Sequence, residues 1–396
     1  MSEDRAILYT PDNHEPLRDK GWDEAWVRTR IEAIADDAES AVGNDGLWPV
    51  HPLDDDPEYW AGAGVYFGAA GVVWALHRLG RERPDLIRDR HARYLERPDW
   101  PGVVPSYLMG EAGILLVSYL LEPAEETAAE LARAIAANRE NESNEMLWGS
   151  PGTMLAALAM HRATGEERWA ELWRSSADEL WRRWESTATG IYLWTQQLYG
   201  KERVLVGAGH GFAGNALALL EGRDLHHSSR ALELDERIVA TAAALARRED
   251  GLANWAPEAG GELAHRAGIR VQWCHGAPGM VMSLSAAAVD DASFTELLEA
   301  GGELVWAAGP LAKGPGLCHG TAGNGVAFLA LFERTGDARW LDRARRFAVH
   351  ALLQVERHRA QYGMGRYSLW TGDLGVALMA ESCIDGRAGM PSLEWA

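Results

Sequence analysis

The feature that most constrains the fold of this chain is a Gly-x-x-Gly motif that stands at the start of seven apolar stretches. Successive copies begin 39 to 65 residues apart, and each copy opens an apolar stretch. Repeats of this length are typical of stacked units that bury their apolar faces against their neighbours. The copies begin at Gly68, Gly110, Gly149, Gly211, Gly276, Gly320 and Gly372.

Several of the apolar stretches are followed by a turn and then by a charged, amphipathic segment. The clearest turn is Thr-Gly-Asp at residues 335–337. After it, Trp340, Ala344 and Phe347 recur at helical spacing on one face. This pattern indicates helical hairpins, each with an inner helix that is apolar nearly all round and an outer amphipathic helix.

Seven such hairpins in 396 residues can close into an α/α toroid with every Gly-x-x-Gly turn at the same end of the barrel. Glycine there lets the backbone turn tightly and approach a bound group closely. An open helical solenoid is the alternative, but the uneven spacing and the lack of distinct capping repeats favour closure. We therefore predict an all-α fold, an α/α toroid.

The repeats run from residue 68 to residue 375, which favours one domain over residues 1–396. We expect residues 1–60 to form an N-terminal cap segment with a helix at about residues 22–42, and residues 61–380 to form the seven hairpins.

The composition limits the partners and the compartment. The net charge of −20 argues against binding to nucleic acid or to an anionic membrane. The chain has no apolar run of membrane-spanning length, and we expect no signal peptide. Three unevenly placed cysteines fit a reducing cytosol, so we predict a cytoplasmic protein.

Two of the seven turns carry a Cys-His pair directly before the first glycine. Residues 273–279 read Trp-Cys-His-Gly-Ala-Pro-Gly, and residues 317–323 read Leu-Cys-His-Gly-Thr-Ala-Gly. Thiolate and imidazole are the usual ligands of zinc, and two such pairs at equivalent points of two repeats can converge on one ion. The alternative is a pair of ordinary buried cysteines beside unrelated histidines. The duplication favours the metal site.

These motifs resemble those of the lanthionine synthetase C-like (LanC-like) family over about residues 60–380. The third matching motif is Gly-Ala-Gly-His-Gly-Phe-Ala-Gly at residues 207–214. The resemblance implies an α/α toroid of seven inner and seven outer helices with one central zinc ion. It also implies zinc ligands at Cys274, Cys318 and His319, with His210 and Arg270 beside the metal.

The amino-acid sequences of the motifs resemble those of the eukaryotic and stand-alone LanC-like proteins more than those of the bacterial lantibiotic cyclases. The cyclases often carry tyrosine where His275 stands, and they tend to have aspartate in place of Glu145. Lys313, five residues before Cys318, matches a position that in the eukaryotic proteins resembles a glutathione contact.

The residue types themselves indicate a chemistry. Three protein ligands leave the fourth position of zinc open for a thiol, which becomes a nucleophile at neutral pH. Its natural electrophile is a dehydroalanine or dehydrobutyrine side chain, and the product is a thioether. His210 can protonate the α-carbon, Arg270 can offset negative charge on the thiolate or the enolate, and Glu145 can orient His210 or the substrate.

Other interpretations remain open. Ligation by His275 would close the coordination shell and make the metal site structural, whereas the family resemblance favours a role outside that shell. A non-catalytic, zinc-containing protein that binds a peptide or glutathione is the main alternative function. A glycosidase would need two carboxylates flanking a cleft, but the turn motifs offer cysteine and histidine. The expected partners are a peptide or protein bearing dehydroamino acids, and glutathione.

Overall fold

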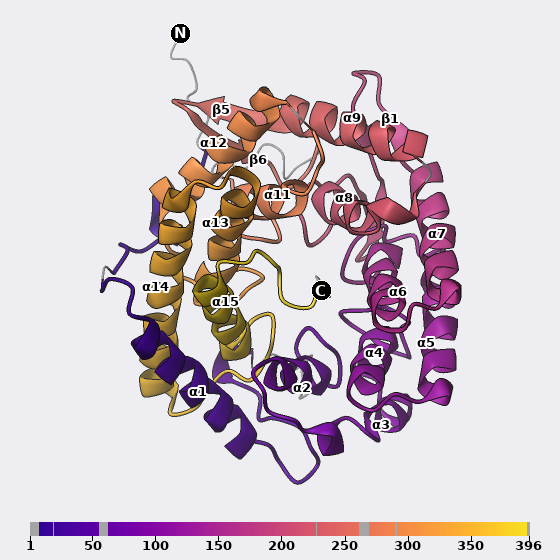
Figure 1. Cartoon of the computed structure of the whole chain (residues 1–396), viewed down its shortest axis with the longest axis vertical. Coiled ribbons are helices and arrows are strands. Elements are labelled where there is room, and N and C mark those ends of the chain that lie inside the picture. The colour runs from indigo at the N-terminus through magenta and orange to yellow at the C-terminus, as the bar shows by residue number, and fades with distance from the viewer. Residues whose placement is uncertain are drawn as a thin grey trace.

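The computed structural model of the chain describes residues 8–18, 20–54, 62–226, 228–260, 269–289 and 291–393. Within these ranges the helices form two concentric rings (Figure 1). The inner ring contains α2 (Ala69–Arg78), α4 (Glu111–Leu121), α6 (Ser150–Thr164), α8 (Phe212–Glu221), α11 (Ala277–Leu284), α13 (Thr321–Thr335) and α15 (Asp373–Asp385). The outer ring contains α1 (Glu24–Ser40), α3 (Arg90–Glu96), α5 (Glu125–Asn138), α7 (Glu167–Arg182), α9 (Ser228–Leu245), α12 (Ala292–Ala308) and α14 (Ala338–Tyr362). The predicted α/α toroid is confirmed.

The remaining elements are short and lie in the connections between helices. The 3-10 helices are η1 (Pro11–Asn13), η2 (Pro52–Asp54), η3 (Pro84–Leu86) and η4 (Arg223–Leu225). The described strands pair as antiparallel hairpins: β1 (Glu185–Ser186) with β2 (Tyr192–Leu193), β3 (Gln196–Leu198) with β4 (Lys201–Arg203), and β5 (Ala246–Glu249) with β6 (Leu252–Trp255). The β3–β4 hairpin lies between α7 and α8.

Contacts between the two ends of the repeat array close the ring. The last inner helix, α15, packs against the first inner helix, α2, while α1 packs against both α14 and α15. The helix expected in the N-terminal cap segment is thus the outer partner of α15. Ion pairs of Arg30 with Glu356 (2.9 Å) and of Asp37 with Arg359 (2.6 Å) join α1 to α14. The open solenoid is therefore wrong.

Each of the seven Gly-x-x-Gly motifs that open an apolar stretch makes the same turn at the N-terminus of an inner helix. The first glycine is the N-cap residue of all seven described inner helices. The second glycine lies in the first helical turn, where an added Cβ would overlap the carbonyl oxygen of the residue six positions earlier. At Gly323 that oxygen belongs to Leu317, and at Gly279 it belongs to Trp273. Glycine thus lets each loop fold back closely over its own helix.

Backbone hydrogen bonds join neighbouring turns into a belt at this end of the barrel. The belt residues stand two positions before the first glycine of their turns. Cys274 donates its N–H to the carbonyl of Cys318 (3.2 Å), and Cys318 donates to Trp370 (2.9 Å). Because these residues share one register, side chains from hairpins far apart in sequence converge. The belt also includes Gly209, which donates to Cys274 (3.4 Å), and Trp370, Tyr66 and Leu108, linked by Trp370 N–H to Tyr66 O (3.3 Å) and Tyr66 N–H to Leu108 O (2.9 Å).

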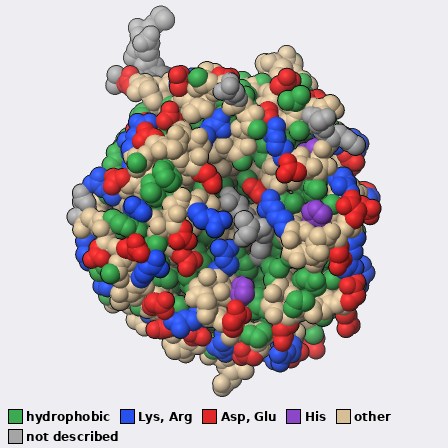
Figure 2. All heavy atoms as spheres, viewed as in Figure 1, with side chains coloured by type: hydrophobic (Ala, Val, Ile, Leu, Met, Phe, Trp, Pro, Cys, Tyr) green, Lys and Arg blue, Asp and Glu red, His purple; other side chains and the backbone are tan. Residues whose placement is uncertain are grey.

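The outer helices have the amphipathic character that the sequence predicts. In α14, Trp340, Ala344 and Phe347 are fully buried. Asp337 caps this helix, because its side chain accepts a hydrogen bond from the N–H of Arg339. Acidic and basic side chains are interspersed over the face of the molecule in Figure 2. None of the helices in the described ranges is both long and apolar enough to cross a membrane.

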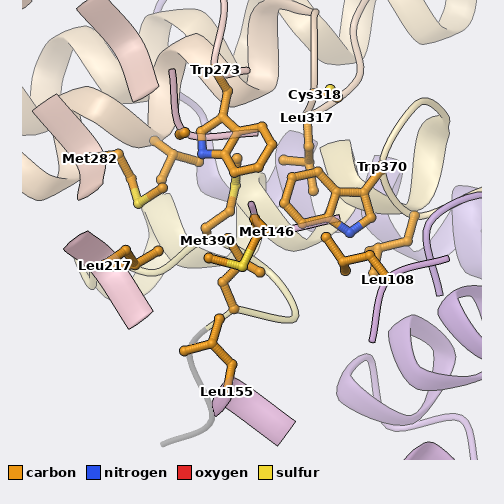
Figure 3. Close-up of a cluster of buried hydrophobic side chains, with 14 of the residues drawn as sticks. Leu108, Met146, Leu155, Leu217, Trp273, Met282, Leu317, Cys318, Trp370 and Met390 are labelled. Carbon is orange, nitrogen blue, oxygen red and sulfur yellow. The ribbon is translucent and has the colours of Figure 1, made fainter. Parts of the chain in front are cut away.

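The segment that follows α15 turns back into the middle of the ring (Figure 1). Met390 and Leu393 are buried there, and Figure 3 shows Met390 beside Met146 among side chains of the inner ring. Tyr107 donates its hydroxyl to the carbonyl of Ser392 (2.5 Å), and Trp370 Nε1 donates to the Ser392 hydroxyl (3.2 Å). Residues 390–393 therefore complete the core of the barrel.

Replacement of Met390 by alanine is expected to lower the free energy of unfolding by about 2–5 kcal/mol, since it leaves a cavity in a closed core. Chemical denaturation followed by tryptophan fluorescence measures the change. Leu232→Ala, at a side chain 68% exposed on α9, is the matched control and should stay within about 0.5 kcal/mol of the wild type. Equal stabilities of the two variants would contradict the core role of Met390.

Candidate functional site

The belt brings two cysteines and a histidine together at one point of the ring. The ligand atoms of Cys274, Cys318 and His319 all lie within 4.8 Å of one another. Both cysteines are buried, and His319 is half-buried. In the described part of the chain this group has three members, and His275 is not one of them.

The donor set fits a zinc ion. Thiolates and imidazole are soft and borderline ligands that suit zinc, and three of them leave one position of a tetrahedron open. The hydrogen bond with Cys318 lowers the pKa of the Cys274 thiol, while burial raises the pKa of Cys318. The hydrogen bond between the two sulfurs therefore favours the thiolate form at Cys274 rather than at Cys318.

Each sulfur also accepts a hydrogen bond from a residue that the sequence analysis did not single out. Gln272 Nε2 donates to Cys274 Sγ (2.9 Å), and the Tyr66 hydroxyl donates to Cys318. The Tyr66 ring also stacks on Trp370, with ring centroids 5.6 Å apart. Donors of this kind orient metal ligands and tune their basicity.

A histidine–carboxylate pair stands beside the cluster. His210 Nδ1 lies 2.9 Å from Glu145 Oε2. Glu145 is fully buried, and it accepts hydrogen bonds from the N–H groups of Leu147 (2.9 Å) and Trp148 (2.6 Å). Burial opposes the charged form of His210, but the hydrogen bond and the charge of Glu145 outweigh it and raise the pKa of His210. The pair thus favours an imidazolium close to the sulfurs.

The pKa of His275 shifts in the opposite direction from that of His210. The ring centroid of His275 lies 5.9 Å from that of His210. Burial lowers the pKa of His275 to about 4, so the ring is neutral at pH 7. Its buried Nδ1 has no hydrogen-bond partner among the described residues.

The two predicted cations flank the site from exposed positions. Arg270 and Lys313 are both exposed. The charge of Arg270 adds to the effect of burial in lowering the pKa of His275, and the charge of Lys313 lowers the pKa of Cys318, against the larger effect of burial. The structure therefore gathers the candidate residues of the sequence analysis around one end of the barrel.

Comparison with known protein families identifies one family that accounts for both the architecture and the motifs. The family model described as "Lanthionine synthetase C-like protein" matches residues 59–394 of the chain. The chain belongs to this family. The family inferred from the Cys-His and Gly-x-x-Gly motifs is thereby confirmed.

Curated relatives of this LanC-like chain include proteins of animals and plants. It is 32% identical over 207 residues to "Glutathione S-transferase LANCL1" of Danio rerio, a match that covers 52% of this chain and 48% of the relative. It is 38% identical over 111 residues to "LanC-like protein GCL1" of Arabidopsis thaliana, covering 26% of this chain and 25% of that protein. The matches thus span about half or less of each relative, and both relatives are of the eukaryotic, stand-alone type.

A solved structure shares the fold at low sequence identity. The structure titled "Nisin cyclase" superposes with a TM-score of 0.65 at 14% identity, and the alignment covers 93% of this LanC-like chain and 97% of that one. This similarity supports the toroid and carries no further conclusion.

Proposed function

We propose that this protein adds a thiol, either of glutathione or of a peptide cysteine, to a dehydroalanine or dehydrobutyrine residue and so forms a thioether. The observation that carries the proposal is a three-member thiol–imidazole cluster next to the His210–Glu145 pair. The name of the zebrafish relative, a glutathione S-transferase, supports glutathione as one thiol.

Cys274, Cys318 and His319 would hold one zinc ion per chain. When bound, zinc supplies Lewis acidity that lowers the pKa of a thiol entering its open position. The side-chain amide of Gln272 and the hydroxyl of Tyr66 keep the two protein sulfurs oriented as ligands.

The overall reaction adds a thiol S–H across a carbon–carbon double bond and needs no other reactant. The sulfur electron pair forms a bond to the β-carbon, and the π electrons move toward the α-carbon and its carbonyl. His210 donates a proton to the α-carbon, and the proton lost by the thiol restores His210. Glu145 holds the Nδ1–H of His210, so that Nε2 can face the substrate.

The exposed cations contribute electrostatically. Arg270 and Lys313 lie where they can attract the carboxylates of glutathione or of an acidic peptide and offset the charge of the enolate. The chain as a whole is acidic, with 58 acidic and 38 basic residues, so cations beside the cluster favour the approach of an anionic substrate.

A reaction with defined components tests the proposal. Incubated with glutathione and a dehydroalanine peptide, the zinc-loaded protein is expected to accelerate formation of the thioether adduct, which mass spectrometry resolves from both reactants. A parallel reaction with a peptide that carries its own cysteine tests the second thiol. Rates equal to the uncatalysed reaction with both thiols would contradict the proposal and would leave the non-catalytic binding function.

A further inference from the structure

The tip of the β3–β4 hairpin holds a tyrosine in a backbone conformation that tyrosine disfavours. Leu198 pairs with Lys201, so Tyr199 and Gly200 form a two-residue loop. Both have positive φ angles, 52° and 71°, as in a type I′ turn. Such turns favour asparagine followed by glycine, and a bulky residue at positive φ is uncommon. The tyrosine therefore needs an explanation other than hairpin stability.

The Tyr199 ring is exposed and lies beside the candidate proton donor. The residue is 72% exposed, and its ring stands edge to face with the ring of His210 at a centroid distance of 6.3 Å. Trp148 Nε1 donates a hydrogen bond to its hydroxyl (3.2 Å). Backbone strain retained next to a reactive group is a sign of function, and exposed aromatic rings suit contacts with a ligand.

Two tryptophans continue the aromatic contacts that begin at Tyr199. Trp148 packs edge to face on Tyr199, with centroids 6.5 Å apart, and on Trp100, with centroids 4.8 Å apart. We name Trp100, Trp148 and Tyr199 the aromatic row. Trp148 stands directly before the first glycine of its turn, as His210 does in its own turn, so both lie at the same end of the barrel.

We propose that the aromatic row binds the part of an extended peptide that flanks the dehydroamino acid, with Tyr199 contacting the side chain two positions away. An extended chain advances about 3.3–3.6 Å per residue. Two residues of a bound peptide therefore span the 6.3 Å between the ring centroids of His210 and Tyr199. Side chains two positions apart point to the same side of an extended chain. The site therefore takes a peptide with an aromatic or large apolar side chain at that position. This inference rests on the proposed function, because it takes His210 as the group that meets the dehydroamino acid.

Two substitutions at one position separate the ring from the turn. Tyr199→Phe keeps the aromatic ring. Tyr199→Asn removes the ring and introduces the residue type that a type I′ turn favours. The probe is a peptide with alanine in place of the dehydroamino acid and phenylalanine two positions away, and its partner peptide has glycine there. Fluorescence anisotropy measures binding without any reaction. Leu232→Asn, at an exposed apolar position on α9, is the matched surface control.

The wild type, Tyr199→Phe and Leu232→Asn are expected to bind the phenylalanine peptide more tightly than the glycine peptide. Tyr199→Asn is expected to lose about tenfold in affinity for the phenylalanine peptide while its thermal unfolding midpoint rises. Unchanged affinity in Tyr199→Asn, or a lower midpoint, would overturn the inference. A wild type that prefers the phenylalanine peptide but does not accelerate thioether formation would leave the aromatic row standing and refute the proposed function.

Discussion

Replacement of Cys318 by serine is expected to abolish stoichiometric zinc binding and to slow thioether formation by about 30-fold or more. A free thiol is only a few per cent ionised at pH 7, so loss of metal-assisted deprotonation alone accounts for a factor of this size. Because the metal would also position the thiol, its loss slows the reaction further. Metal analysis of the purified variant and mass spectrometry of the product measure the two effects separately.

The third cysteine offers a matched control. Cys383 is buried in α15, as Cys318 is in its turn, but the Cys383 sulfur contacts Met379 and lies outside the cluster. Burial raises the pKa of Cys383, which makes it an inert thiol. Cys383→Ser should keep one zinc per chain and the wild-type rate. One zinc per chain in Cys318→Ser would contradict the ligand assignment.

The local motif explains why so much of the ring was predictable. Each Gly-x-x-Gly turn is fixed by close approach of its own loop, so the sequence reveals it without knowledge of the neighbouring hairpins. The partner of α15 was less predictable. Helix α1 carries no such motif, and only the closure of the ring places it beside a helix more than 300 residues away.

The candidate site shows the same difference between residues that a repeated motif reveals and residues that only the folded structure reveals. Cys274 and Cys318 were found because their motif is duplicated in the same register, which the belt converts into proximity. Tyr66 occupies that register too, two positions before Gly68, but a tyrosine at this point reads as an ordinary core residue until the packing is known. Gln272 and Tyr199 depend on a single local geometry each, a hydrogen bond to sulfur and a strained turn, and neither repeats elsewhere as a motif.

Replacement of His210 by alanine is expected to lower kcat by about 10²–10⁴-fold while one zinc per chain is retained. The imidazole is the proposed proton donor, and it lies on a different turn from all three ligands of the cluster. Rapid-mixing kinetics with a dehydroalanine peptide, combined with metal analysis, measures both quantities. Full activity of His210→Ala would refute the role of this histidine even if the protein is an enzyme.

Glu145→Gln tests the same pair through pH. Against the opposing effect of burial, Glu145 raises the pKa of His210, so the protonated donor persists to higher pH. A proton donor must be protonated to act, so it contributes to the rate at a pH below its pKa. That contribution is lost as the pH rises through the pKa. In Glu145→Gln the pKa of His210 falls, and the alkaline limb of the rate profile should move to lower pH. His77 and Glu82 form an equally short pair (2.9 Å) at the surface, so Glu82→Gln is the matched control and should leave the limb in place. A limb that stays fixed in Glu145→Gln would show that another group donates the proton.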